Sequence, residues 1–195
     1  MRKRPVVIVN ARPSAPEPTA RELDVDGRVH ALMALGDAPL GELRWLQPAA
    51  FRREWQLVSD RGEHLLVRGH GLTGRRATVE TPNATWELVR SWAGQVSLAA
   101  TEGRPLARVV TGWLGRSRIE PAAGPALVWR RHWRGHRTLA DEEGHELLGL
   151  RPLWAFLRWQ CVVTLTDAGR QREDLVPLLA ATFFDWLSEP RGHAH

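Results

Sequence analysis

The chain has 195 residues, of which 43% are hydrophobic and 25% are charged, and its formal net charge is +5. This length and composition fit one globular domain and exclude a wholly disordered chain. No apolar run approaches the ~18–20 residues that cross a bilayer, so the sequence predicts no transmembrane helix. A single cysteine, Cys161, excludes a disulfide framework and a cysteine-based zinc finger.

Residues 1–38 form a predicted N-terminal extension. Its short apolar run at 6–9 is too brief for a secretory signal, and the prolines that follow interrupt regular structure. We therefore expect a Pro-rich, partly disordered linker, then a barrel domain over 39–189 and a disordered tail at 190–195. With no export signal in view, we expect a cytoplasmic protein that is peripheral at the membrane if its ligand is a lipid.

From about residue 40 to residue 166 the pattern is that of β-structure. Short runs rich in Val, Leu, Thr and Trp alternate with turns that contain Gly, Asn or Asp, as in residues 54–58, 59–62 and 64–67. No helical segment separates these runs. We therefore expect a meander of antiparallel hairpins rather than alternating β and α units.

The basic charge is almost entirely arginine, because Lys3 is the only lysine. Such a bias is typical of a GC-rich genome, so arginine abundance alone is weak evidence for nucleic-acid binding. Residues 104–137 nevertheless carry a net charge of +7, with Glu120 as their only acid, and residues 138–195 carry −4. This segregation predicts either a solvated face with internal ion pairs or an anion-binding surface. The candidate anion-binding residues are Arg104, Arg108, Arg116, Arg118, Arg130, Arg131, Arg134 and Arg137.

The last regular element is an apolar segment, predicted to form a helix over about 174–188. Asp174 is a candidate N-cap, and Pro177 falls in the first turn, where proline is tolerated. The apolar residues would cover every face of this helix, with Asp185 as the main polar break, so the helix must be buried. At ~1.5 Å per residue it would be only ~20 Å long, too short for a bilayer core. We expect β-strands to surround it.

A β meander that closes on a buried C-terminal helix resembles the tubby-like fold shared by LURP-one-related proteins and phospholipid scramblases. The resemblance extends from about Trp45 to Leu187 and implies a closed antiparallel barrel of about twelve strands, threaded by that helix. The residues that carry it are Leu46-Gln47-Pro48, Glu54-Trp55-Gln56-Leu57, Trp86-Glu87-Leu88-Val89-Arg90, Trp129, Trp133, the 141–144 turn and the 175–187 helix.

The family resemblance implies a binding role rather than a reaction. Tubby domains bind phosphoinositide headgroups through basic side chains, whereas the palmitoylated cysteine run of the scramblases has no counterpart here. We therefore expect a non-catalytic binding or scaffold module that recognises anionic lipid headgroups or phosphate through arginines, whose guanidinium fork suits phosphate. Two alternatives remain open: single-stranded nucleic-acid binding by the same arginine and tryptophan surface, which includes the segment 129–134, and a small-molecule hydrolase.

Three motifs that resemble catalytic or ligand-binding motifs have simpler structural explanations. A G-x-G-x-x-G match begins at Gly69, but a strand follows it, so we predict a hairpin loop and not a dinucleotide site. His132 and His136 flank a predicted turn and belong to no H-E-x-x-H frame. Cys161 lies among apolar residues and is expected to be buried. The sequence thus predicts no catalytic residue, no cofactor and no metal ligand.

Overall fold

The structure is a computed structural model. It describes residues 32, 34–35, 42–49, 51–71, 73–112, 116–155 and 158–188, with the backbone alone for 154–155 and 158–159. These residues belong to one compact unit, Ala31–His195. Most of the predicted extension 1–38 and the whole predicted tail 190–195 lie outside the described residues. Leu35, which is described, is buried and packs in the core of the domain.

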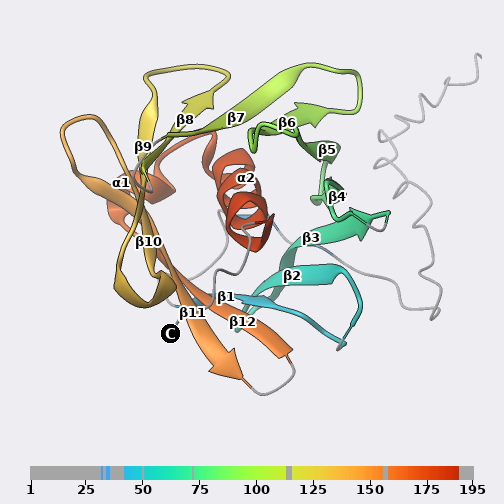
Figure 1. The fold of residues 1–195 in the computed structure, drawn as a ribbon. Coiled ribbons are helices and arrows are strands. Elements are labelled where there is room, and N and C mark those ends of the chain that lie inside the picture. Colours follow the sequence, from blue (N-terminus) through green and yellow to red (C-terminus); the bar gives the residue numbers. More distant parts are fainter. Residues whose placement is uncertain are drawn as a thin grey trace, which may run out of the picture. The chain divides into compact units, whose positions relative to one another are not determined.

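Twelve strands form a single closed antiparallel barrel (Figure 1). They are β1 (Leu43–Leu46), β2 (Glu54–Ser59), β3 (Gly62–His70), β4 (Arg76–Glu80), β5 (Thr85–Arg90), β6 (Val96–Ala100), β7 (Pro105–Thr111), β8 (Arg116–Pro121), β9 (Leu127–Arg131), β10 (Arg137–Ala140), β11 (Glu146–Ala155) and β12 (Arg158–Leu165). Each strand pairs with its neighbours in the sequence, and β12 returns to β1, with Val163 opposite Leu43. The predicted meander and the closed twelve-strand barrel are confirmed.

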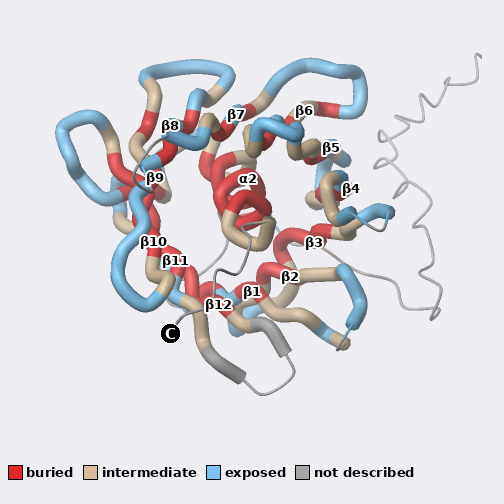
Figure 2. The backbone as a smooth tube through the Cα atoms, viewed as in Figure 1, coloured by how far each residue is buried: buried red, intermediate tan, exposed pale blue. Residues whose placement is uncertain are grey.

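Helix α2 (Leu175–Ser188) lies in the centre of the ring of strands (Figures 1 and 2). Residues 178–185 are all buried, as a helix that is apolar on every face requires. The Trp45 ring of β1 stacks on Phe183 of α2, with ring centroids 3.9 Å apart. The predicted burial of this helix is therefore confirmed. Within the described residues, no helix combines the length and the apolar content needed to cross a membrane.

The antiparallel order places successive connections at alternate ends of the barrel. In the described part of the chain, the connections from odd-numbered to even-numbered strands lie at the end where α2 finishes, since Phe184, Leu187 and Ser188 border the same cavity as three of them. The sequence of these segments, 47–53, 71–75, 91–95, 112–115, 132–136 and 156–157, contains no aspartate or glutamate. We call this end the basic end.

The opposite end of the barrel, the acidic end, carries the remaining connections and the short helix α1 (Asp167–Arg170). Its connecting segments, together with residues 166–174 that follow β12, include Asp60, Glu102, Asp141, Glu142, Glu143, Asp167, Glu173 and Asp174. Helix α2 therefore begins at the acidic end and finishes at the basic end, although its own first turn carries no acidic residue and its last turn no basic residue.

Candidate anion-binding site

Two arginines face each other across neighbouring strands at the basic end. Side chains alternate in and out along a strand, so Arg75 faces inward like Ala77 of β4, and Arg90 faces inward like Leu88 of β5. The Arg90 amide donates a hydrogen bond of 2.7 Å to the Arg75 carbonyl, which extends the β4–β5 ladder by one pair. Like charges directly opposite in a sheet are destabilising. This pair therefore calls for a counter-charge.

The facing arginines line a cavity of about 630 Å³ between the end of α2 and the strands β2 to β5. Its cationic residues are Arg52, Arg53, Arg75 and Arg90. None of the described residues that line it is acidic. The volume is within the usual range of small-molecule sites, roughly 300–1,000 Å³. The cavity thus has the size and the charge to hold a small anion.

Three buried donors at this cavity have no acceptor among the described residues. They are Nη1 of Arg75, Nη1 of Arg90 and the indole Nε1 of Trp55. Leaving a buried donor unsatisfied costs about 1–3 kcal/mol, and more where the group is charged. An anion in the cavity would supply the counter-charge that Arg75 and Arg90 lack among the described residues. Phosphate matches this description because the guanidinium fork can donate two parallel hydrogen bonds to it.

Glycines make room for the arginine side chains. A Cβ at Gly69 of β3 would lie 3.1 Å from the Cβ of Arg53, and Arg53 Nη1 donates a hydrogen bond to the Gly71 carbonyl. Gly74 has a φ of +64°, and a Cβ added to it would lie 3.4 Å from Arg53 Nη1. The G-x-G-x-x-G segment therefore connects β3 to β4, as predicted. Its glycines also shape the arginine cavity, which the sequence did not indicate.

The rim of the cavity includes an exposed tryptophan. The guanidinium carbon of Arg75 lies 3.2 Å from the centroid of the Trp92 ring, a close cation–π contact. Trp92 is 87% exposed, so the guanidinium covers one face of the ring and the rest is accessible to solvent. A ligand in the cavity would therefore change the surroundings of Trp92 and its fluorescence.

A second facing pair of arginines at the basic end has an internal counter-ion. Arg137 of β10 lies opposite Arg131 of β9 and is only 2% exposed. Its Nη1 is 3.8 Å from Oδ2 of Asp185 on α2, and the same oxygen accepts a 3.2 Å hydrogen bond from Trp129 Nε1. Arg137, one of the candidate anion-binding residues of the sequence, is therefore buried inside the barrel, where its inward position pairs it with the helix. Arg75 and Arg90 have no such carboxylate among the described residues.

The remaining arginines of the 104–137 stretch do not form one surface. Arg108, Arg116, Arg118 and Arg130 lie on the outer face of strands β7 to β9, with Arg116 directly opposite Arg130. Two of the exposed residues have acidic neighbours: Arg118 Nη2 lies 3.8 Å from Glu142 Oε1, and Arg104 Nε lies 4.0 Å from Glu102 Oε1. Arg104 is at the acidic end, whereas Arg131 and Arg134 are at the basic end.

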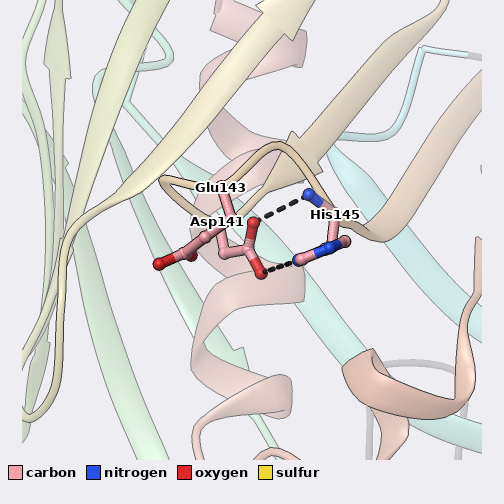
Figure 3. Close-up of side chains that lie close together, drawn as sticks. All are labelled: Asp141, Glu143 and His145. Atoms are coloured by element: carbon pink, nitrogen blue, oxygen red, sulfur yellow. Dashed lines mark hydrogen bonds and ion pairs between the residues drawn. The ribbon is translucent and has the colours of Figure 1, made fainter.

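One cluster of acidic and imidazole groups has the spacing of a metal site (Figure 3). Asp141, Glu143 and His145 come from the β10–β11 connection, and their ligand atoms lie within 4.8 Å of one another. The backbone amide and the ring Nδ1 of His145 bind the two oxygens of Asp141, at 2.7 and 3.0 Å. Desolvation acts to raise the pKa of Asp141, but these hydrogen bonds hold it below its ordinary value. The turn's own hydrogen bonds explain why Asp141 and His145 are close together.

The other singled-out residues serve packing or local hydrogen bonding. Cys161 is buried against the helix side of β12, and desolvation raises its thiol pKa to about 12. His132 Nε2 lies 2.7 Å from Thr138 Oγ1, and its ring is 5.3 Å from that of His136. Desolvation, followed by the nearby His132, lowers the pKa of His136. No third metal-ligating group joins this histidine pair among the described residues.

Comparison of the sequence with protein-family models gives no match. Comparison with curated proteins gives none either. The candidate site therefore stands on its own geometry.

Sequence reasoning did not single out Arg53, Arg75 or Arg90 as an anion site. Arg90 entered only as part of a family-like segment, and the other two are far from the basic stretch at 104–137. The alternation of inward and outward side chains was nevertheless a usable signal. Arg53 and Arg75 each stand two residues before an inward-facing residue of a strand, and Arg90 stands two residues after one. Counting charge along the chain cannot detect this, because the three positions come together only when strands β2 to β5 pair side by side.

Proposed function

We propose that this chain is a non-catalytic binding module of the tubby-like type, which holds a phosphate-bearing anion in the arginine cavity at the basic end. The observation that carries the proposal is the facing pair Arg75 and Arg90, each with a buried Nη1 that lacks an acceptor among the described residues. The ligand is either an anionic lipid headgroup or a free phosphate compound. The closed twelve-strand barrel around one helix is consistent with the tubby-like assignment.

The composition of the cavity favours binding over catalysis. Its described lining contains arginines, tryptophans, glycines and a few hydroxyl groups, but no carboxylate, imidazole or thiol that could act as a general base. One of the hydroxyls, Ser188 Oγ, already donates to the Phe184 carbonyl at 2.6 Å. A guanidinium group offers several hydrogen-bond donors and no acceptor, so these arginines suit electrostatic recognition rather than proton transfer.

The nucleic-acid alternative receives less support from the structure. It requires stacked bases on the tryptophans of residues 129–134, but Trp129 is fully buried and its indole donates to Asp185. Of Trp129 and Trp133, only Trp133 is exposed, at 85%. We therefore prefer the phosphate cavity to the 129–134 segment.

Titration with inositol hexakisphosphate, and separately with inorganic phosphate, tests the proposal. Binding is followed by tryptophan fluorescence and by the rise in Tm. We expect Arg75→Met and Arg90→Met to weaken binding about tenfold or more, because a hydrogen bond to a charged group contributes ~1.5–3 kcal/mol. Added salt should weaken wild-type binding as well.

Arg116→Met is the matched control for these variants. It also removes one arginine from a directly facing pair, but that pair lies on the outer face of β8 and β9. We expect it to bind like the wild type. If Arg116→Met and Arg75→Met weaken binding equally, binding depends on overall charge and the cavity is not the site. If neither probe binds at low salt, the proposed function is refuted.

A further inference from the structure

Three large hydrophobic side chains of the described residues are mainly exposed, and all three lie at the basic end. Phe51 is 95% exposed, Trp92 87% and Trp133 85%. They belong to the β1–β2, β5–β6 and β9–β10 connections, which are every second connection around this end of the closed barrel. The three aromatic side chains therefore stand at roughly equal intervals around one rim. We call them the aromatic tripod.

Backbone strain occurs at one tripod position and directly beside another. Among the described residues, the non-glycine residues with positive φ are Phe51, at +69°, and Arg134, at +60°, which follows Trp133. Non-glycine residues in this region cost of order 1 kcal/mol and cluster where a function requires them. An exposed aromatic ring on a strained turn adds nothing to the core. The rings are therefore presented outward from the basic end.

The charge around the tripod has one sign. Arg52 lies beside Phe51, Arg75 covers one face of Trp92, and Arg134 follows Trp133. The connecting segments at this end contain no acid, whereas the acidic end collects carboxylates. The surface of a partner that binds the basic end must therefore carry negative charge and must also allow aromatic rings to insert into it.

The arrangement of the tripod favours a flat partner. A twelve-stranded barrel with strands ~4.8 Å apart and tilted by ~40° has a rim roughly 20–25 Å across. Three projections spaced around such a rim define a plane, whereas a single nucleic-acid strand follows a line. The interfacial layer of an anionic bilayer is planar, accepts tryptophan rings and places phosphates at the level of nearby arginines.

We infer that the protein docks end-on to an anionic membrane surface, with Phe51, Trp92 and Trp133 inserted between the headgroups and the axis of α2 directed at the bilayer. This inference rests on the proposed function, because the arginine cavity would then open toward the headgroups. The aromatic tripod supplies the attachment, and the cavity supplies the recognition of phosphate.

Trp133 permits a test that leaves the cavity unchanged, because it is not among the cavity's lining residues. The full chain is sedimented with phosphatidylcholine vesicles that contain phosphatidylglycerol, and inositol hexakisphosphate binding is measured in parallel. We expect Trp133→Ser to weaken vesicle binding about tenfold or more, to leave inositol hexakisphosphate binding unchanged, and Trp133→Phe to restore vesicle binding.

A second pair of variants tests the orientation. Arg134→Gln and Arg104→Gln each remove one exposed arginine, but Arg134 is at the basic end and Arg104 at the acidic end. We expect only Arg134→Gln to weaken vesicle binding. Equal effects of the two variants, or wild-type vesicle binding by Trp133→Ser, would overturn end-on docking.

Two further outcomes separate this inference from the proposed function. If single-stranded oligonucleotides bind more tightly than vesicles and lose affinity in Trp133→Ser, the basic end is a nucleic-acid surface and the membrane assignment is wrong. If inositol hexakisphosphate binding is insensitive to Arg75→Met while vesicle binding still requires Trp133, the cavity proposal fails and membrane docking stands without it.

Discussion

Asp185 is the position where a single change should most clearly reveal how the helix is held in the barrel. The carboxylate is 2% exposed, lies 3.8 Å from Arg137 Nη1 and accepts a hydrogen bond from Trp129 Nε1. Asp185→Asn keeps an acceptor for Trp129 but removes the charge that compensates Arg137. Removing one member of a buried ion pair costs about 3–5 kcal/mol. Because the hydrogen bond to Trp129 is retained, we expect the lower value, about 3 kcal/mol.

Thermal and urea unfolding followed by tryptophan fluorescence measure this loss. For a domain of this size about 3 kcal/mol corresponds to a decrease in Tm of roughly 6–12 °C. The control is Glu42→Gln, which breaks the 2.7 Å pair with Arg44, whose side chains are about half exposed. Exposed pairs contribute ~0–1 kcal/mol, so this control should shift Tm by no more than a few degrees.

The double variant Arg137→Met/Asp185→Asn decides whether charge is the cause. Replacing both members of a buried pair is often neutral, because no uncompensated charge remains in the interior. We therefore expect the double variant to regain most of the stability that Asp185→Asn loses. If it is as unstable as the single variant, or if Asp185→Asn is no less stable than Glu42→Gln, the carboxylate does not compensate Arg137 and the contrast with the Arg75–Arg90 pair loses its basis.

Two other predictions concern packing and ionisation. A Cβ at Gly169 would lie 2.1 Å from the Leu147 carbonyl oxygen, whereas one at Gly144 would meet nothing within 4 Å. We therefore expect Gly169→Ala to lower the free energy of unfolding by about 3 kcal/mol or more. Gly144→Ala should lower it by only about 1 kcal/mol, because of the positive φ at that position, and urea unfolding measures both losses. Burial raises the pKa of the Cys161 thiol from 9.0 to about 12, so the native thiol should resist alkylation at pH 8 and react on unfolding. The unfolded thiol ionises first, so this contribution to stability is complete below pH 9 and is lost as the pH rises toward 12, and Cys161→Ala should abolish that part of the pH dependence.

Most of the fold could be predicted from the sequence because its two strongest patterns are local. Alternating strands separated by Gly and Asp turns indicate a meander, and a helix without a polar face indicates enclosure. Strand β11 is an example that local sequence patterns do not predict. Its Pro152 would ordinarily end a central strand, yet it lies opposite Cys161 within the β11–β12 ladder. Closure of the barrel depends on the pairing of β1 with β12, which no local pattern encodes.

The candidate site was harder to predict because charge along the chain differs from charge in space. The basic stretch at 104–137 is divided by successive strands between the outer face, both ends and the core. Arg53, Arg75 and Arg90 meet because inward rows of three strands finish at the same end. Extending the inward-facing positions of each strand by two residues would have found all three arginines. The same procedure would also have selected Arg131, which lies opposite Arg137. The position of Asp185 on the central helix distinguishes Arg137, which has a carboxylate 3.8 Å away, from Arg75 and Arg90, which have none beside them among the described residues.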